Sequence, residues 1–366
     1  MKKIALIGST GSIGRQVLEV VRGRKDLFKI VALAAQNPSE EFNRQVREFK
    51  PEYSALASQN AEAALKAAEI ESADLVFNAA TGFAGLEYSV RALKAGKNLA
   101  LANKETLVCG GELITRLAKT AGKEIIPVDS EHSAIWQCLN FDRKADFKKL
   151  VITASGGAFR GKKWEDLKSV TPEQALNHPT WQMGKKITVD SATLLNKGYE
   201  VIEAHVLFNA PYSKIETVIQ PQSIVHSLVE FKDGAVIAQM GTPTMEVPIR
   251  LALTYPQRLA GAVKPLSFKN AFSVEFQPLK AKDYPLYALA MQAAKEGGTL
   301  PCALNAADEV AVKAFLDKKI AFTDILTVVE SVLAATPRDE AVSLKQLAEV
   351  DSVARWKAQK LIFKLR

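Results

Sequence analysis

Two carboxylates and two hydroxyls are concentrated in the stretch Ile126–Ser133, which reads Ile-Pro-Val-Asp-Ser-Glu-His-Ser. Asp129 and Glu131 are two residues apart, and they follow an apolar run that we expect to form a short buried strand over Glu124–Val128. If the backbone stays extended, both carboxylates point to the same face at the end of that strand. Two carboxylates directed at one point repel each other and favour a cation between them. Oxygen ligands of this kind suit Mg²⁺ or Mn²⁺ better than a soft metal.

The same residues also allow a purely structural interpretation. Asp129 or Ser130 could cap the helix that follows, predicted over Ser133–Leu139, with Glu131 in its first turn. Both interpretations fit these eight residues, so the elements around them have to decide.

A glycine-rich turn near the start of the chain indicates a dinucleotide site. Lys3–Ile7 is a predicted strand, Gly8–Gly14 reads Gly-Ser-Thr-Gly-Ser-Ile-Gly, and an amphipathic helix follows. Glycines between a strand and a helix let the backbone approach a pyrophosphate at the helix N-terminus. The alternative is a glycine turn that only packs the helix on the strand.

The second predicted strand, Lys29–Ala34, ends in Ala35-Gln36-Asn37. An NAD site is expected to carry an acidic residue here to bind the ribose 2′-hydroxyl. No acidic residue occurs before Glu40. This leaves room for a 2′-phosphate and favours NADP.

Strands and helices continue to alternate over Asp74–Asn78, Leu86–Lys94, Asn98–Ala102 and Glu112–Thr120. This alternation predicts a doubly wound parallel sheet, with ligand-binding residues at the carboxyl ends of its strands. Lys104 lies just past one such strand, so we expect it to face a ligand rather than solvent.

The middle of the chain is rich in hydrogen-bond donors. Ser155 follows a predicted strand over Val151–Ala154, and the stretch Val189–Gly198 contains Ser191, Asn196 and Lys197. Such donors can bind an anion, although a capped helical turn is the alternative interpretation of Val189–Gly198.

A loop and a helix in the same region carry further candidates. His178–Gly184 contains Trp181 and Met183 between a proline and a glycine, so the loop is either anchored to a core or closes over a ligand. A helix predicted over Tyr199–Phe208 carries Glu200 and Glu203. Strands predicted over 223–231 and 235–240 form a hairpin through Asp-Gly. The middle region is therefore α+β.

A proline-rich stretch, 256–285, is predicted to be a linker, and the helical periodicity from Leu286 onward predicts a small bundle. The predicted architecture is α/β, with a Rossmann-like NADP-binding domain, a central α+β catalytic and dimerisation domain, a linker and a C-terminal helical bundle. Their predicted ranges are 1–127, 128–256, 257–284 and 285–366.

Composition excludes several classes of protein. The 366 residues are 48% apolar and 24% charged, which is typical of a soluble globular chain. The net charge of +8 is spread along the chain and favours a small anionic substrate over nucleic acid. The basic tail Arg355–Arg366 has helical apolar spacing, which favours a helix face over a nucleic-acid arm. No apolar run approaches the length of a membrane span. Three widely separated cysteines fit a reducing, cytoplasmic location.

These motifs together resemble the 1-deoxy-D-xylulose 5-phosphate reductoisomerase family. The resemblance covers all three regions in order, and its most specific part is His178–Ala204. The matching segments are GSTGSIG at 8–14, LANKE at 101–105, VDSEHSA at 128–134, SGG at 155–157, HPTWQMGKKITVDSATLLNKGYEVIEA at 178–204 and ALNAADEVAV at 303–312.

The resemblance assigns roles to residues. It implies that the divalent metal, Mn²⁺, Mg²⁺ or Co²⁺, is bound by Asp129, Glu131 and Glu200. It implies that NADPH is bound by Thr10, Gly11, Ser12, Ile13, Ala35, Gln36, Asn37, Asn103, Glu105 and Gly184. It implies that the substrate is contacted by Lys104, Ser130, Glu131, Ser155, His178, Trp181, Met183, Ser191, Asn196, Lys197 and Glu200. Lys104 and Glu131 are the candidates for proton transfer, and Trp181 and Met183 belong to a closing lid.

The implied activity is the NADPH- and metal-dependent rearrangement and reduction of 1-deoxy-D-xylulose 5-phosphate to 2-C-methyl-D-erythritol 4-phosphate, in isoprenoid precursor biosynthesis, by a cytoplasmic homodimer. At Ala35-Gln36 the chain departs from the glycine and basic residue that the family often has. Two alternatives are another NAD(P)-dependent dehydrogenase, which would not need a metal, and a nucleotide-sensing or nucleic-acid-binding protein, which would not turn over.

Overall fold

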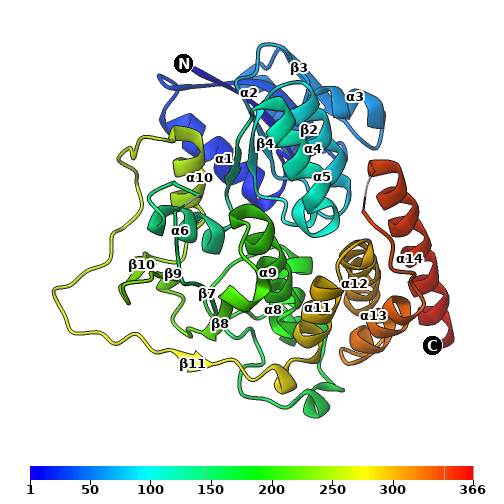
Figure 1. Ribbon diagram of the computed structural model, residues 1–366. Coiled ribbons are helices and arrows are strands. Elements are labelled where there is room, and N and C mark those ends of the chain that lie inside the picture. Colours follow the sequence, from blue (N-terminus) through cyan, green and yellow to red (C-terminus); the bar gives the residue numbers. More distant parts are fainter. Residues whose placement is uncertain (144, 342, 366) are drawn as a thin grey trace. The chain divides into compact units, whose positions relative to one another are not determined.

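The computed structural model describes residues 1–143, 145–341 and 343–365, which form two compact units. The N-terminal unit comprises Met1–Leu107, Gly111–Ser133 and Thr244–Lys264. The C-terminal unit comprises the remaining described residues, including Val108–Gly110 from the middle of a helix. In Figure 1 the colours follow the sequence, from blue at the N-terminus to red at the C-terminus. The division into functional domains at 127, 256 and 284 stays a prediction.

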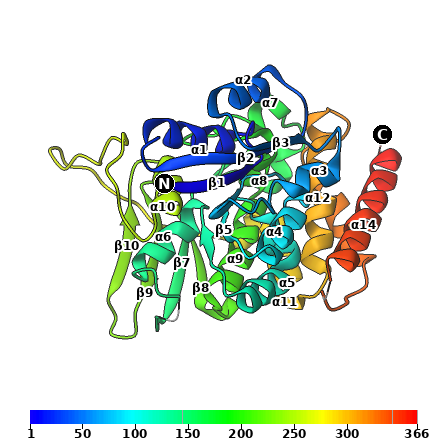
Figure 2. The same ribbon diagram turned by 90° about the horizontal axis from the view of Figure 1, so that it is seen from above.

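The N-terminal unit is built on a six-stranded parallel sheet with the order β3-β2-β1-β4-β5-β6. Its elements are β1 (Lys2–Ile7), α1 (Ser12–Gly23), β2 (Phe28–Ala35), α2 (Glu40–Phe49), β3 (Tyr53–Leu56), α3 (Ala61–Lys66), β4 (Leu75–Asn78), α4 (Ala84–Lys94), β5 (Asn98–Leu101), α5 (Glu105–Ala121), β6 (Ile125–Pro127) and, from later in the chain, α10 (Glu246–Thr254). Figure 2 shows α1 and α2 on one side of β1 and β2, with α4 and α5 on the other. The doubly wound fold predicted from the sequence is confirmed.

The central strands are buried on both faces, which explains their unbroken apolar sequences. All of Ile4–Ile7 in β1 is at most 1% exposed. The chain leaves β1 at Gly8 with φ of +77°, and a Cβ on Gly8 would lie 2.3 Å from the carbonyl oxygen of Ala79. Only glycine lets the first turn approach the end of β4 this closely.

Four elements of this unit, α2, β3, α3 and α10, were not predicted. The prediction that a helix starts at Glu112 is also wrong, because α5 begins at Glu105. Its helical path is interrupted at Gly110, with φ of −135° and ψ of 29°. The consecutive glycines Gly110 and Gly111 hide the first part of the helix from a periodicity argument.

The C-terminal unit combines a mixed five-stranded sheet, with the order β10-β9-β7-β8-β11, and a group of helices. The strands are β7 (Lys149–Ala154), β8 (Ile215–Ile219), β9 (Val225–Glu230), β10 (Val236–Met240) and β11 (Gln277–Pro278). The helices are α6 (Ser130–Cys138), whose first residues belong to the other unit, α7 (Pro172–Ala175), α8 (Lys185–Thr193), α9 (Leu195–Phe208), α11 (Pro285–Glu296), α12 (Leu300–Leu316), α13 (Asp324–Ala334) and α14 (Leu344–Leu365), with short 3-10 turns at Trp164–Leu167, Tyr212–Lys214 and Ala281–Asp283.

The hairpin β9–β10 and the helical character of the chain after Leu286 are confirmed. The basic tail continues α14 to Leu365, and Arg366 lies outside the described residues. The predicted linker is not wholly irregular, because it contains β11, which pairs with β8. Helix α9 packs closely on α11, since a Cβ on Gly198 would lie 2.4 Å from the Cβ of Ala290.

The cysteines Cys109, Cys138 and Cys302 are buried free thiols. Among the described residues, no helix has the length and apolar character needed to cross a membrane.

Candidate active site

The carboxyl ends of two neighbouring strands bring together a lysine and an aspartate. Lys104 follows β5, Asp129 follows β6, and these strands pair in parallel. The Lys104 Nζ lies 2.6 Å from an Asp129 carboxylate oxygen, with the two side chains only 8% and 12% exposed. The alternative of a solvated lysine is therefore wrong, and the position at the strand ends is where doubly wound folds bind ligands.

The local geometry of Asp129 and Glu131 differs from the extended strand end that we expected. Helix α6 begins at Ser130, and its first turn contains Glu131. Asp129 occupies the helix start, where its Oδ1 accepts a hydrogen bond from the Ser130 amide at 3.0 Å. The Ser130 hydroxyl donates to the Glu131 carboxylate. The structural interpretation is correct that a helix follows Asp129 and has Glu131 in its first turn, but this helix begins at Ser130 and not at Ser133 as predicted.

The glycine turn has the features of a pyrophosphate cradle. Helix α1 starts after Gly11, which has no side chain to cap the helix N-terminus. A Cβ on Gly14 would lie 2.2 Å from the carbonyl oxygen of Gly8. The turn brings Thr10, Gly11, Ser12 and Ile13 to the carboxyl end of β1, with backbone amides at the N-terminus of α1. A bound pyrophosphate would accept hydrogen bonds from such amides.

The end of β2 offers no carboxylate to a ribose. Ala35 is buried, whereas Gln36 and Asn37 are exposed. The first acids beyond them are engaged within α2, because Glu40 pairs with Arg47 and Glu41 pairs with Arg44. This arrangement favours a 2′-phosphate over a bare 2′-hydroxyl.

Asn103 and Glu105 hold the loop that follows β4. The Asn103 amide donates to the carbonyls of Ala80 and Gly82 and to Glu105, at 3.0, 3.1 and 2.8 Å. The Glu105 carboxylate also accepts from the Gly82 amide. Both side chains therefore shape the strand-end loop on which a cofactor would rest.

In the C-terminal unit, Ser155 and His178 are in direct contact. Ser155 follows β7, and its hydroxyl lies 3.0 Å from His178 Nε2. The His178 Nδ1 accepts hydrogen bonds from the amides of Thr180 and Trp181, at 3.2 and 3.0 Å. Because Nδ1 accepts, the neutral ring carries its proton on Nε2 and donates it to Ser155. Burial lowers the pKa of His178, which favours this neutral ring.

The segment His178–Gly184 has no helix or strand and connects α7 to α8. The Trp181 ring lies 6.0 Å from the ring of His226 on β9. The Thr180 hydroxyl lies 3.1 Å from the hydroxyl of Ser223. These contacts place the loop over the sheet of its own unit, while Met183 is half-buried and Gly184 starts α8.

The donors predicted for an anion lie where α8 meets α9. Ser191 is near the end of α8, and Leu194 then adopts a left-handed conformation with φ of +57°. Asn196 and Lys197 follow in the first turn of α9, which begins at Leu195 and not at Tyr199 as predicted. Both of them contact the Glu200 carboxylate, with the Asn196 amide at 2.5 Å.

Family models match most of the chain. The model described as 1-deoxy-D-xylulose 5-phosphate reductoisomerase matches residues 4–71 and 59–111, its C-terminal domain model matches 125–208, and the DXP reductoisomerase C-terminal domain model matches 240–357. The 1-deoxy-D-xylulose 5-phosphate reductoisomerase of Thermodesulfovibrio yellowstonii is 45% identical over 99% of this chain and 100% of that protein. The chain belongs to the 1-deoxy-D-xylulose 5-phosphate reductoisomerase family.

Solved reductoisomerase structures share the whole fold. The enzyme from Zymomonas mobilis in complex with NADPH has a TM-score of 0.89 at 36% identity, covering 99% of each chain. A DOX-P reductoisomerase in complex with NADPH, fosmidomycin and magnesium has a TM-score of 0.92 at 36% identity, covering 99% of this chain and 98% of that one. The predicted family and fold are confirmed.

Several polar residues close to predicted site residues in the sequence or the structure were missed by sequence reasoning. His132 is buried in α6, with its Nδ1 3.7 Å from the Asp129 carboxylate. His226 and Ser223 support the 178–184 loop. Glu203 on α9 is only 1% exposed and does not face solvent. The sequence does show that these polar residues lie among apolar ones, which indicates burial. It does not show which residues they contact.

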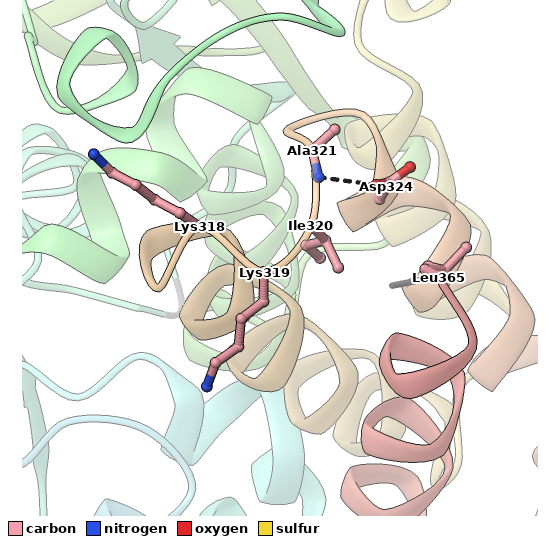
Figure 3. A pocket seen from close by; sticks show the side chains of 6 residues that line it. All are labelled: Lys318, Lys319, Ile320, Ala321, Asp324 and Leu365. Carbon is pink, nitrogen blue, oxygen red and sulfur yellow. Dashed lines mark hydrogen bonds between the residues drawn. The ribbon is translucent and has the colours of Figure 1, made fainter.

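Two cavities lie away from the predicted site residues. One, of about 650 Å³, lies beside the turn between α12 and α13 (Figure 3). Lys318 and Lys319 point away from Ile320 and Leu365 there, and they pair with Glu173 and Asp317. The other, of about 730 Å³, is lined by α1, α10 and residues 259–262. An ion pair between Arg250 and Glu246 occupies part of its wall.

Proposed function

We propose that this protein converts 1-deoxy-D-xylulose 5-phosphate and NADPH to 2-C-methyl-D-erythritol 4-phosphate and NADP⁺, with a divalent metal. Family membership supports the reaction, and the observation that carries the site is the buried Lys104–Asp129 pair at the carboxyl ends of β5 and β6. The product places the reaction in isoprenoid precursor biosynthesis, and the buried free thiols support a cytoplasmic location.

The proposed metal ligands are Asp129, Glu131 and Glu200. Carboxylate oxygens are the donors that Mg²⁺ and Mn²⁺ prefer, and Co²⁺ is an alternative ion. Glu200 is 1% exposed, and its carboxylate already contacts a cation, the Lys197 amino group. When bound, the ion would act as a Lewis acid toward the ketone and adjacent hydroxyl of the substrate.

The chain's own residues bind and orient the substrate in this proposal. Hydroxyl, amide and ammonium donors from Ser155, Ser191, Asn196 and Lys197 hold the phosphate, because charge-assisted hydrogen bonds to phosphate are strong. Ser130 contacts the sugar. His178, Trp181 and Met183 cover the bound substrate and exclude water. Lys104 and Glu131 handle the proton transfers. Lys104 pairs with the proposed metal ligand Asp129, and Glu131 is itself a proposed ligand.

NADPH is proposed to bind at the glycine turn, with its 2′-phosphate beside Ala35, Gln36 and Asn37. Asn103 and Glu105 hold the strand-end loop, and Gly184 completes the site. The cofactor supplies the hydride, while the protein supplies position and charge.

The test of the activity is NADPH oxidation, followed at 1-deoxy-D-xylulose 5-phosphate saturation with and without Mn²⁺. We expect turnover only with metal, and a product that carries a branched carbon skeleton by NMR. Metal-independent oxidation of NADPH with an unbranched product would instead favour a simple dehydrogenase.

We also propose that the protein is a homodimer that pairs through β10. This strand is at the end of its sheet, and Val236, Ile237 and Met240 on it are 55%, 48% and 37% exposed. An exposed apolar edge strand is a template for pairing with another chain. Ala238→Pro should give a monomer in sedimentation, whereas Val353→Asp, at an equally exposed apolar position on α14, should not.

A further inference from the structure

A buried carboxylate in the C-terminal helices contacts both helices that carry the proposed phosphate donors. Asp308 lies on α12, inside the Ala303–Val312 motif, and is 1% exposed. Its carboxylate lies 2.7 Å from the Lys186 Nζ on α8. It also accepts a hydrogen bond at 3.3 Å from the hydroxyl of Tyr199 on α9. One side chain thus connects three helices.

Lys186 is at the centre of this cluster. Its amino group lies 2.6 Å from the Asp190 carboxylate, one turn along α8, as well as 2.7 Å from Asp308. It also lies 5.0 Å from the centre of the Tyr199 ring, within cation–π range. Two carboxylates therefore share one ammonium group in a buried environment. Removal of Lys186 takes away the cation that both carboxylates share, which is costly in a buried environment.

The members of this cluster are adjacent in sequence to the proposed substrate residues. Lys186 is in the first turn of α8, directly after the 178–184 loop. Asp190 precedes Ser191, and Tyr199 lies between Lys197 and Glu200. The contacts of Asp308 therefore reach the start of α8 through Lys186 and the first turns of α9 through Tyr199. Lys186 in turn pairs with Asp190 near the end of α8.

We propose that Asp308 is a positioning residue that holds the 178–184 loop and the phosphate donors in register through Lys186 and Tyr199. The effect on catalysis rests on the proposed function, whereas the effect on the loop does not. Asp308 touches neither substrate nor cofactor in this proposal; it acts through the two helices.

The same helix offers a matched control. Glu309, the next residue on α12, pairs with Arg355 on α14 at 2.6 Å, and Arg355 also pairs with Asp351 at 2.7 Å. This second, partly buried ion-pair group joins α12 to α14. Arg355→Gln therefore disturbs the bundle electrostatics without removing a contact between α12 and α8.

The kinetic test compares Asp308→Asn, Lys186→Gln and Arg355→Gln. We expect the first two to raise KM for 1-deoxy-D-xylulose 5-phosphate about tenfold, with KM for NADPH changed less than twofold. The effects of the two changes in the double variant should be less than additive, because both single changes remove the contact between Lys186 and Asp308. Arg355→Gln should leave both KM values near those of the unmodified protein. Two outcomes would overturn the proposal. One is that Asp308→Asn and Arg355→Gln raise KM for 1-deoxy-D-xylulose 5-phosphate equally. The other is that Asp308→Asn raises KM for NADPH as much as KM for 1-deoxy-D-xylulose 5-phosphate.

Amide hydrogen exchange tests the positioning without any turnover. In the ligand-free protein, Asp308→Asn and Lys186→Gln should speed exchange over residues 178–193 several-fold, while α14 is unchanged. Unchanged exchange over 178–193 would contradict the proposal. If the unmodified protein shows no activity with 1-deoxy-D-xylulose 5-phosphate, the proposed function fails, and the exchange comparison still decides the role of Asp308. If Asp308→Asn does not fold, Lys186→Gln and Tyr199→Phe provide the same comparison.

Discussion

The amino group of Lys104 lies 2.6 Å from the Asp129 carboxylate, and the two residues reach this distance from neighbouring parallel strands. The pair is largely removed from solvent, so each charge depends on the other. Breaking a buried ion pair by removing one partner costs about 3–5 kcal/mol, which greatly exceeds the value of a surface pair. The pair therefore contributes to stability and also holds a potential metal ligand.

We predict that Lys104→Met lowers the free energy of unfolding and makes the protein unusually responsive to Mg²⁺. Without the ammonium group, the charge of Asp129 is uncompensated, and a bound cation should restore part of the stability. The measurement is the melting temperature with and without MgCl₂. Lys232→Met is the control, because Lys232 pairs with Asp146 in solvent, with both side chains about two-thirds exposed. Identical Mg²⁺ responses for the two variants would count against a metal at Asp129.

Cofactor choice is predicted to depend on the end of β2. Ala35→Asp should shift the ratio of kcat/KM for NADPH over NADH toward NADH by tenfold or more, because a carboxylate there repels the 2′-phosphate and can accept from the 2′-hydroxyl. Glu40→Gln is the control, since Glu40 already pairs with Arg47. The prediction fails if the unmodified protein uses both cofactors with equal efficiency.

The loop 178–184 is predicted to loosen as pH falls. Burial lowers the pKa of His178, so the folded loop binds a proton less readily than the unfolded one. The neutral ring's contribution is fully present above the ordinary histidine pKa of about 6.5 and is lost as pH falls below it toward the lowered value. Protonation of Nδ1 would also break its bonds from the amides of Thr180 and Trp181.

The measurement for this pH effect is Trp181 fluorescence and proteolysis of the loop between pH 7.5 and 5. His178→Gln should remove the pH dependence while it weakens substrate binding. If the loop is equally resistant to proteolysis at pH 7.5 and pH 5, the proposed role of the His178 contact is contradicted. If it is equally resistant with and without substrate, the closing-lid interpretation is contradicted.

The order of elements and the polar strand ends could be predicted because both are local properties of the sequence. Strand and helix periodicity identified β1, β4 and β5, and the residues directly after them are the ones that meet at the sheet edge. The two-residue spacing of Asp129 and Glu131 was interpreted with the wrong backbone geometry, because Ser130 starts a helix as readily as it ends a strand.

Tertiary contacts between distant segments were beyond this reasoning. The pair of Trp181 with His226 and the pair of Lys186 with Asp308 join residues far apart in sequence. Sequence periodicity cannot predict either contact, because each contact depends on how the helices and strands pack against one another. The break of α5 at Gly110 likewise concealed that Asn103, Lys104 and Glu105 lie directly at a helix start.

The phosphate donors are predicted to act on the phosphorylated substrate selectively. Ser191→Ala combined with Asn196→Ala should reduce kcat/KM for 1-deoxy-D-xylulose 5-phosphate at least a hundredfold, because two hydrogen bonds to a charged group are lost. Turnover of the unphosphorylated sugar should fall much less. A uniform loss for both substrates, together with a lower melting temperature, would show that these residues serve the fold of α8 and α9.

The choice between Glu200 and Glu203 as a metal ligand gives the sharpest test. Both lie on α9, and both are 1% exposed, so burial does not separate them. Their surroundings do, because the Glu200 carboxylate is contacted by Asn196 and Lys197, the residues proposed to bind the substrate. A metal that chelates the same small substrate must lie within reach of those donors, which favours Glu200. Glu203 is about one helical turn further along.

We therefore expect Glu200→Gln to raise the Mn²⁺ concentration needed for half-maximal activity by at least a hundredfold and to lower kcat. Glu203→Gln should lower the melting temperature, because it alters a buried carboxylate, but should leave the Mn²⁺ requirement within a few-fold of the unmodified protein. Activity measured against Mn²⁺ concentration for the two variants, with melting curves in parallel, separates the two effects. The reverse ranking would assign the metal to Glu203 and would move the proposed substrate position along α9.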